Sequence, residues 1–87
     1  MTVYVDTLKP WPNSKDSWWW CHMATDSDDL NELHAIADRI GLKRAWFQDH
    51  HRVPHYDLTA SKRRLAVKAG AVEVGPKELL MMCRRGK

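Results

Sequence analysis

The sequence predicts a small α/β domain in which three helices pack against a partly parallel sheet of four short strands. Two observations lead to this prediction. Short runs of β-branched and aromatic residues alternate along the chain with longer amphipathic segments, and glycine or proline follows most of these segments. Because 87 residues have room for only one core, we expect a single domain, residues 1–87, with the element order β-β-α-β-α-β-α.

Two strands are expected in the first part of the chain. Residues 2–6 are β-branched and aromatic and end on the carboxylate of Asp6. Residues 8–17 contain two prolines and predict a loop, after which the apolar run 18–24 (WWWCHMA) predicts the second strand. Strand alternation assigns this run to two faces, one with Trp18, Trp20, His22 and Ala24, the other with Trp19, Cys21 and Met23.

The clearest helix follows this second strand. Thr25, Asp26 and Ser27 offer capping oxygens, and Gly41 is placed to end the helix. Its predicted inward stripe consists of Leu30, Leu33, Ala37 and Ile40.

The remaining elements are shorter. Residues 45–47 (AWF) predict a third strand, followed by a polar loop through residue 57. Thr59 or Ser61 is expected to cap a second helix, which ends at Gly70 and turns Leu65, Ala66 and Ala69 inward. Residues 71–74 predict the fourth strand, and Gly75-Pro76 begins a third helix that runs from Lys77 to about Arg84.

Composition limits the class of protein. The formal charge of +3 permits a polyanionic partner, and basic residues concentrate between residues 62 and 68. Cys21 and Cys83 form no CxxC pair and are expected to be reduced thiols. No stretch has the length of a membrane helix and no signal peptide is recognisable, so we expect a soluble, cytoplasmic protein without a membrane partner.

The segment His55-Tyr56-Asp57 is the strongest local candidate for chemistry. An imidazole and a carboxylate two residues apart can share a metal ion or act as acid and base. The following helix N-terminus, with Lys62 and Arg63 near its first turn, suits a phosphate group. The alternative is that Asp57 only caps the helix and His55 is a turn residue, and the local sequence leaves both open.

Three other features carry alternatives. His22 lies among tryptophans, so it needs either a hydrogen-bond partner or a ligand. His50 and His51 lie in a charged loop and are expected to be solvated. The WWW run is interpreted as core plus a self-association surface, or as a stacking platform for bases. Packing is favoured because no basic residue is interleaved in the run.

Several segments together resemble a known family. The order and spacing of seven segments resemble those in short bacterial and phage proteins catalogued as domain of unknown function 4031. The segments are VYVD, CHMATD, DLNELHAIADRIGL, WFQ, HYD, SKR and AVKAGAVEV. The resemblance runs from Thr2 to about Val74 and implies no activity. It implies these polar positions: Asp6, His22, Asp26, His34, His55, Tyr56, Asp57, Lys62 and Arg63. The link DHHRVP before HYD is longer than in the family, which weighs against His50 and His51 as site residues.

Two functions from different classes are predicted. The first is a metal-dependent phosphoester hydrolase acting on a nucleotide or nucleic acid. Its zinc, manganese or magnesium ion would be held by Asp6, His22, His55 and Asp57. The catalytic candidates are His22, His55, Asp57 and His34, with Lys62 and Arg63 as the phosphate clamp. The alternative is a non-catalytic binding module for a nucleotide, a nucleic acid or a host protein. Its protein contact would be Trp18 and Trp20, and so short a chain is also expected to form a homodimer.

Overall fold

A computed structural model describes residues 2–10 and 19–86, so Trp18 and part of the predicted loop lie outside the described residues. The strands are β1 (Val3–Val5), β2 (Lys9–Pro10), β3 (Trp19–Thr25), β4 (Tyr56–Thr59) and β5 (Val72–Glu73). The helices are α1 (Asn31–Arg39), α2 (Ala60–Lys68), α3 (Pro76–Cys83) and the short 3₁₀ helix η1 (Arg44–Trp46).

The sheet is built around β3. On one edge, β3 pairs antiparallel with β1 and, further along, with β2; on the other edge it pairs antiparallel with β4. β5 joins the far side of β1 and runs parallel to it. The α/β class and the partly parallel sheet are therefore confirmed, with five strands among the described residues where four were predicted.

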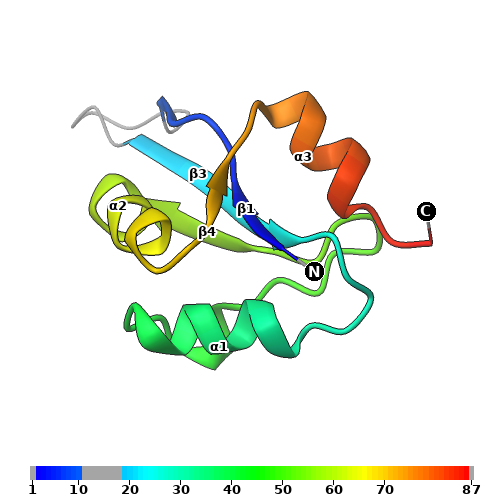
Figure 1. The fold of residues 1–87 in the computed structure, drawn as a ribbon, viewed down its shortest axis with the longest axis horizontal. Coiled ribbons are helices and arrows are strands. Elements are labelled where there is room, and N and C mark those ends of the chain that lie inside the picture. The colour runs from blue at the N-terminus through cyan, green and yellow to red at the C-terminus, as the bar shows by residue number, and fades with distance from the viewer. Residues whose placement is uncertain (1, 11–18, 87) are drawn as a thin grey trace.

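The helices cover the two faces of the sheet unequally. α1 and α2 pack on one face over the larger core, which includes Leu33 of α1 and Ala66 of α2. α3 lies on the opposite face, as Figure 1 shows, over a smaller cluster that includes Leu79 and Cys83. Because α3 has only eight residues, part of this second face is left to polar side chains from the strands.

Side-chain alternation in β3 agrees with the prediction. Cys21 and Met23 are fully buried in the core beneath α1 and α2, whereas Ala24 belongs to the cluster beneath α3. Burial raises the pKa of the Cys21 thiol to about 12, so this cysteine stays protonated and is a packing residue. The even-numbered residues of β3 therefore face the side of the sheet that α3 covers only in part.

The first helix is confirmed, but its predicted caps are wrong. Leu33, Ala37 and Ile40 are buried, and Gly41 adopts a φ of 85°, the left-handed conformation expected after a helix end. α1 begins only at Asn31, and Leu30 occupies the N-cap position without a side-chain hydrogen bond.

The predicted capping residues lie upstream of α1 and have other partners. Asp29 N–H donates to Ser27 Oγ, a turn contact. The Asp26 carboxylate accepts a hydrogen bond from Thr2 N–H at 2.8 Å and one from Tyr4 Oη at 3.4 Å, which ties the end of β3 to the start of β1.

The second helix is capped as predicted but packs differently. Thr59 Oγ1 accepts the N–H of Lys62, so Thr59 is the N-cap. Ala66 is completely buried, whereas Leu65, predicted to face inward, is 46% exposed. The helix meets the sheet along a narrow line of small residues, so a leucine one position away already faces solvent.

The third predicted strand is wrong. Residues 44–46 form η1, and Trp46 is half-exposed. The strand in this part of the chain is β4, in the segment predicted to be a loop. Tyr56 and Leu58 are buried while Asp57 and Thr59 are not, which is the period-two pattern of a strand with one buried face. The polar residues at alternate positions of this segment are the reason that the sequence predicted a loop here.

Candidate functional site

Strand periodicity brings the candidate side chains onto one face. Val5 packs in the larger core, so Asp6, the next residue, points to the opposite face of the sheet. His22 and Asp57 are direct cross-strand partners between β3 and β4, which places both side chains on the same face. His55 lies two residues before Asp57 and shares its side of the chain. Residues far apart in the sequence therefore meet, with His22 and Asp57 inside strands and Asp6 and His55 directly next to them.

Asp6 is the buried anchor of this group. Its side chain is 1% exposed, and its two oxygens accept from His22 N–H at 2.7 Å and His22 Nδ1 at 2.8 Å, with Lys9 Nζ at 3.3 Å. Burial by itself raises the pKa of a carboxyl group. Here the hydrogen bonds from His22 and the charges of His22 and Lys9 outweigh it and lower the pKa of Asp6. Asp6 is therefore an ionised, fully satisfied acceptor.

The contact with Asp6 fixes the ring of His22. A carboxylate can only accept, so Nδ1 of His22 carries the hydrogen that Asp6 binds. Nε2 is left as the nitrogen with an available lone pair whenever the ring is neutral. The His22 ring stands edge-on to the ring of His55, with 4.9 Å between the centroids. The carboxylate–histidine arrangement is the one that orients metal-binding histidines in proteins.

His55 is oriented in the same way by a different acceptor. Its Nδ1 lies 2.7 Å from the carbonyl oxygen of Val53 and must donate to it. Its Nε2 then faces Asp57 Oδ1 at 3.4 Å. Burial lowers the pKa of His55, but Asp57, the Val53 carbonyl and Asp6 raise it by more, so the pKa ends above the ordinary value. The space between Nε2 and Oδ1 therefore favours a positive charge.

Asp57 has one satisfied oxygen and one that is not. Gln48 Nε2 donates to Oδ2 at 2.6 Å. Oδ1 is buried and accepts no hydrogen bond from the described residues; its recorded contact is the ion-pair distance to His55. Burial raises the pKa of Asp57, but His55, Gln48 and the charge of His22 outweigh it and lower the pKa. A buried, ionised oxygen without a hydrogen bond is costly unless a cation lies beside it.

Three ligand atoms converge at this point. A nitrogen of His22, a nitrogen of His55 and an oxygen of Asp57 all lie within 4.8 Å of one another. Around a tetrahedral zinc ion with bonds of 2.0–2.1 Å, neighbouring ligand atoms are roughly 3.3 Å apart. Small side-chain rotations that close the widest separation by about 1.5 Å would give three ligands with the remaining coordination position open.

Two members of this group, His22 and His55, line a cavity of about 320 Å³, whereas Asp57 lies outside its lining. Asp6, His22 and His55 form its polar side, and Pro76, Leu79 and Leu80 of α3 form its apolar side. Lys9, His50, Arg52 and Val53 complete the lining. The cavity is thus the uncovered part of the second sheet face, enclosed between the strands, the segment before β4 and α3.

Comparison with known proteins identifies the family. Residues 3–86 match the model of a family described as a protein of unknown function, DUF4031. The chain belongs to the DUF4031 family. The resemblance predicted from the sequence motifs is therefore confirmed over essentially the whole chain. No curated protein and no solved structure matches it.

Two predicted site residues of the DUF4031 chain have structural contacts elsewhere. Lys62 Nζ donates to the carbonyl oxygen of Ile40 at the end of α1, 2.7 Å away. Arg63 donates from Nε to the backbone oxygen of Asp6 and from Nη1 to Glu73, at 2.8 and 2.7 Å. Neither residue lines the cavity, so the predicted phosphate clamp is not assembled by these two side chains.

His34 is also separated from the group. It lies on α1, and its Nδ1 is 2.8 Å from the hydroxyl of Tyr56, whose ring is buried in the larger core. The His22–His55–Asp57 group is on the other face of the sheet. Burial and the charge of Arg44 lower the pKa of His34, so it is a neutral partner of Tyr56 near neutral pH. The predicted catalytic role of His34 is not supported by this position.

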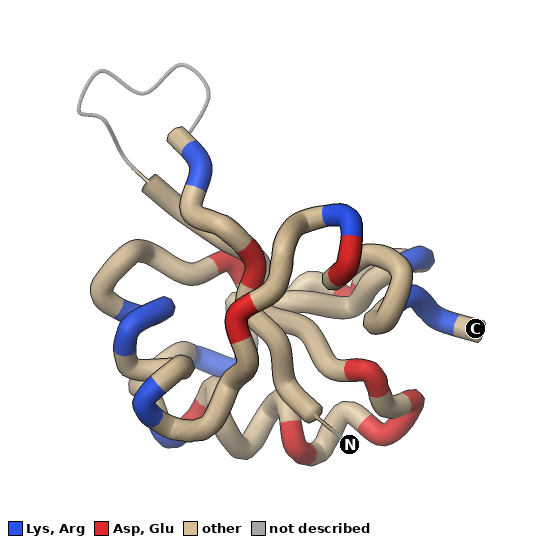
Figure 2. Tube along the Cα trace, turned by 45° about the horizontal axis from the view of Figure 1, so that its top comes forward, with Lys and Arg blue, Asp and Glu red and all other residues tan. Residues whose placement is uncertain are grey.

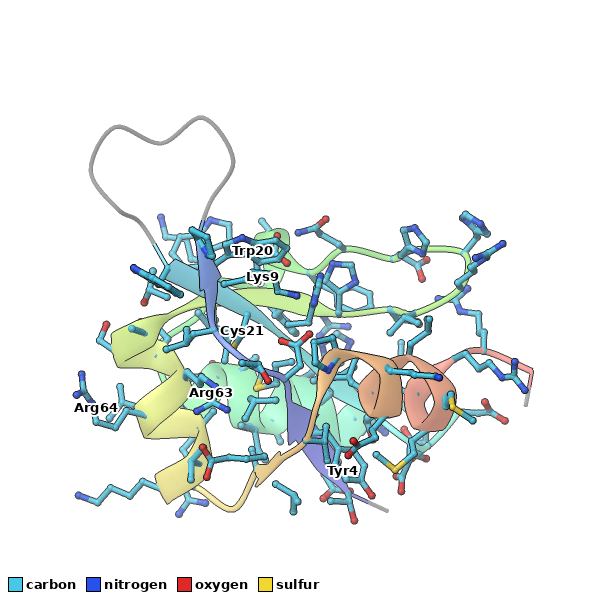
Figure 3. The ribbon with its side chains drawn as sticks, turned by 90° about the horizontal axis from the view of Figure 1, so that it is seen from above. Tyr4, Lys9, Trp20, Cys21, Arg63 and Arg64 are labelled. Atoms are coloured by element: carbon cyan, nitrogen blue, oxygen red, sulfur yellow. The ribbon has the colours of Figure 1, made fainter. Side chains whose placement is uncertain are left out.

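The tryptophans divide between the two faces, as alternation predicts. Trp20 shares the face of His22, with 4.7 Å between the two ring centroids, and Lys9 Nζ lies 5.0 Å from the Trp20 ring centroid (Figure 3). Trp19 is the more exposed, at 49%. Trp20 is therefore part of the surroundings of the candidate site, and its predicted protein contact stays a prediction.

Four residues that surround the group were not predicted. Gln48 holds Asp57, Lys9 contacts Asp6, and His50 and Arg52 line the cavity. For Gln48 a signal existed, because it is the last residue of the WFQ motif. His50 is exposed as predicted, yet its Nδ1 accepts from the N–H of Arg52, which shapes the cavity wall. Nothing local in the sequence marks Lys9 or Arg52, because their relevance depends on which strands pair.

Proposed function

We propose that this protein is a divalent-metal-dependent hydrolase of phosphoesters, with His22, His55 and Asp57 as the metal ligands. The observation that carries the proposal is the buried Asp57 Oδ1, which lacks a hydrogen bond and lies beside imidazole nitrogens already oriented for coordination. A divalent cation would pair with that oxygen. It would also take the place of the proton that His55 otherwise binds beside Asp57. Two imidazoles and a carboxylate suit zinc or manganese better than magnesium, which prefers oxygen ligands.

Asp6 has a supporting role in this proposal. Both of its oxygens are occupied by His22 and Lys9, so it acts through His22 as a positioning residue. This differs from the prediction that Asp6 is itself a ligand. Such supporting acceptors typically change metal affinity by about 10–100-fold when removed.

The proposed reaction is simple hydrolysis. A metal lowers the pKa of a bound water, which supplies hydroxide near neutral pH. Attack of that water oxygen on phosphorus would break the ester P–O bond. The water would lose one proton to solvent and the leaving oxygen would gain one, which gives phosphate and an alcohol. His50 is the described imidazole of the cavity lining outside the ligand set. Its Nδ1 accepts backbone N–H groups, so the neutral ring carries its hydrogen on Nε2 and can donate a hydrogen bond to the leaving oxygen, which takes its proton from water.

The first test is metal binding. We expect zinc or manganese to bind the metal-stripped protein in isothermal titration calorimetry and to raise its melting temperature. His55→Ala and Asp57→Ala should each weaken binding by more than about 100-fold, and Asp6→Asn by about 10–100-fold. His51→Ala removes a neighbouring exposed imidazole outside the group and is the matched control. Equal affinity in His55→Ala and His51→Ala would eliminate the proposed site.

The second test is turnover. The metal-loaded protein should hydrolyse p-nitrophenyl phosphate, and His55→Ala should abolish the rate while His51→Ala keeps it. Metal binding without turnover of phosphate monoesters or diesters would instead support the alternative, a non-catalytic module that binds a nucleotide, a nucleic acid or a host protein.

The setting of the protein is a further part of the proposal. In the described parts of the chain, no helix has the length and apolarity needed to cross a bilayer. Cys21 and Cys83 are buried and form no disulfide, which supports the expected reducing cytoplasm. A homodimer and a host-protein partner stay predictions.

A further inference from the structure

The cavity beside the proposed metal ligands has features that point to a class of substrate, and this inference rests on the proposed function. The charge of its lining is the first feature. Lys9 and Arg52 are cationic, and Asp6, the carboxylate among the described residues that line the cavity, is already bonded to His22 and Lys9. With a divalent ion bound, the cavity is strongly positive and favours an anionic ligand.

The two cations approach from opposite ends of the polar side. Lys9 belongs to β2, which pairs with β3 at Trp19 and Trp20. Arg52 precedes β4, whose first residue, Tyr56, pairs with Met23 at the other end of β3. The two cations therefore come to the same cavity from different segments of the chain.

Both cations keep donors available for a ligand. The ammonium of Lys9 has three donors; it donates to Asp6 Oδ2 at 3.3 Å and lies 3.4 Å from His22 Nδ1. The guanidinium of Arg52 makes no hydrogen bond or ion pair to any described residue, although its backbone is held on both sides. Its N–H donates to His50, and its carbonyl accepts the N–H of Arg85. The guanidinium thus extends from a fixed backbone.

The apolar side is the second feature. Pro76, Leu79 and Leu80 of α3 face the histidines across the cavity, and Leu80 is 45% exposed. An inorganic anion would leave this wall against water. A ligand with an apolar or aromatic group beside its phosphate would cover it, at roughly 25 cal/mol per Å² of apolar surface removed from water.

Size and charge distribution disfavour a nucleic acid strand. A cavity of about 320 Å³ is at the small end of ligand pockets, which suits one phosphate and one ring. Polymer binding needs a row of phosphate contacts. Figure 2 shows Lys and Arg positions scattered over several elements, among them β2, α2, the start of α3 and the C-terminal end, and interspersed with acidic positions. Lys62 and Arg63 of α2 are bonded to Ile40, Asp6 and Glu73.

We propose that the site takes a small phosphomonoester whose organic part is a single aromatic or apolar group. Lys9 and Arg52 bind its phosphate beside the metal, and Leu79 and Leu80 pack against the organic part. Lys9 and Arg52 thereby take the role that the sequence had assigned to Lys62 and Arg63. The specificity comes from two different surfaces of the cavity. The two cations bind the phosphate, and the apolar side of α3 binds the organic part.

The test uses phenylphosphonate, whose P–C bond is not hydrolysed, titrated into the zinc-loaded protein. Arg52→Gln and Lys9→Gln should each weaken its binding by about 10-fold, the typical loss for a charged hydrogen bond. Arg64→Gln is the matched control, because Arg64 is exposed on α2 and points away from the sheet (Figure 3). Phenylphosphonate should bind at least several-fold more tightly than methylphosphonate, and Leu80→Asn should reduce that ratio.

Three results would overturn the inference. One is an equal loss of affinity in Arg64→Gln and Arg52→Gln. Another is equal affinity for phenylphosphonate and methylphosphonate. The third is tighter binding of a single-stranded DNA ten-mer than of phenylphosphonate. Zinc titration of the same variants separates this inference from the proposed function, because Arg52→Gln should leave zinc affinity unchanged. Failure of the wild-type protein to bind zinc contradicts the metal site itself.

Discussion

At the scale of single residues, the site depends on acceptors that fix the histidine rings. Asp6 and the Val53 carbonyl each take the Nδ1 hydrogen of one histidine, so both rings are held with Nε2 available. Asp57 is held by Gln48 through one oxygen only. The second oxygen accepts no hydrogen bond from the described residues and has only His55 Nε2 near it, at 3.4 Å, so a bound cation would complete its contacts.

The raised pKa of His55 gives a test in the metal-free protein. A histidine whose folded pKa lies above its unfolded value stabilises the fold below the unfolded pKa of about 6.5, and this contribution is lost as pH rises through the folded pKa. Asp57→Asn removes a cause of the shift, so the pKa of His55 should fall in an NMR titration of its ring. Asp28→Asn, an exposed change, should leave it where it is. An unchanged pKa of His55 in Asp57→Asn would show that the carboxylate does not stabilise the imidazolium.

At the scale of elements, short pieces are held by specific end contacts. β4 passes directly into α2 at Thr59, whose hydroxyl caps the helix while its backbone still pairs with Trp20 of β3. Lys62 Nζ binds the carbonyl oxygen of Ile40 at the end of α1, next to Gly41. These contacts join the two helices that cover the larger core.

Thr59 therefore offers a direct test of how firmly this junction is fixed. Thr59→Ala removes the capping oxygen and should lower the free energy of unfolding by about 1 kcal/mol in urea denaturation. Thr59→Ser keeps the hydroxyl and should recover most of that loss. If both variants were equally unstable, the lost stability would come from the methyl group in the strand instead of from the cap.

At the scale of the whole molecule, one side chain connects three parts of the fold. Arg63 extends from α2 to the backbone of Asp6 after β1 and to Glu73 of β5, with 18% of its side chain exposed. The sequence motif SKR thus marks a structural position.

Arg63→Met should show this by stability. We expect a loss of about 2 kcal/mol in the free energy of unfolding, since two acceptors lose a charged donor. Arg64→Met, on the exposed neighbour, should stay within about 0.5 kcal/mol of the wild type. In the folded Arg63→Met protein, affinity for phenylphosphonate should change little. A large loss of phosphonate affinity at unchanged stability would restore Arg63 as a phosphate-binding residue.

The sequence by itself determined what depends on neighbours along the chain. The stripe of α1, the turn at Gly41, the Thr59 cap and the two faces of β3 follow from local periodicity and local hydrogen bonds. The His/Asp composition of the site was also visible, because HYD, His22 and Asp6 stand out among apolar residues. The sequence indicated β4 only in part, because its alternating pattern covers four residues and is no longer than a turn.

Only the tertiary structure decided which polar residues meet. β1 and β4 are not neighbours; β3 lies between them, and His22 on β3 is the bridge from Asp6 to His55 and Asp57. His34 lies on the other face of the sheet, and Lys62 and Arg63 make structural contacts. The cavity is lined by Lys9 and Arg52 instead. The physical reason is that strand pairing joins residues distant in the chain, and a local pattern does not specify the partner.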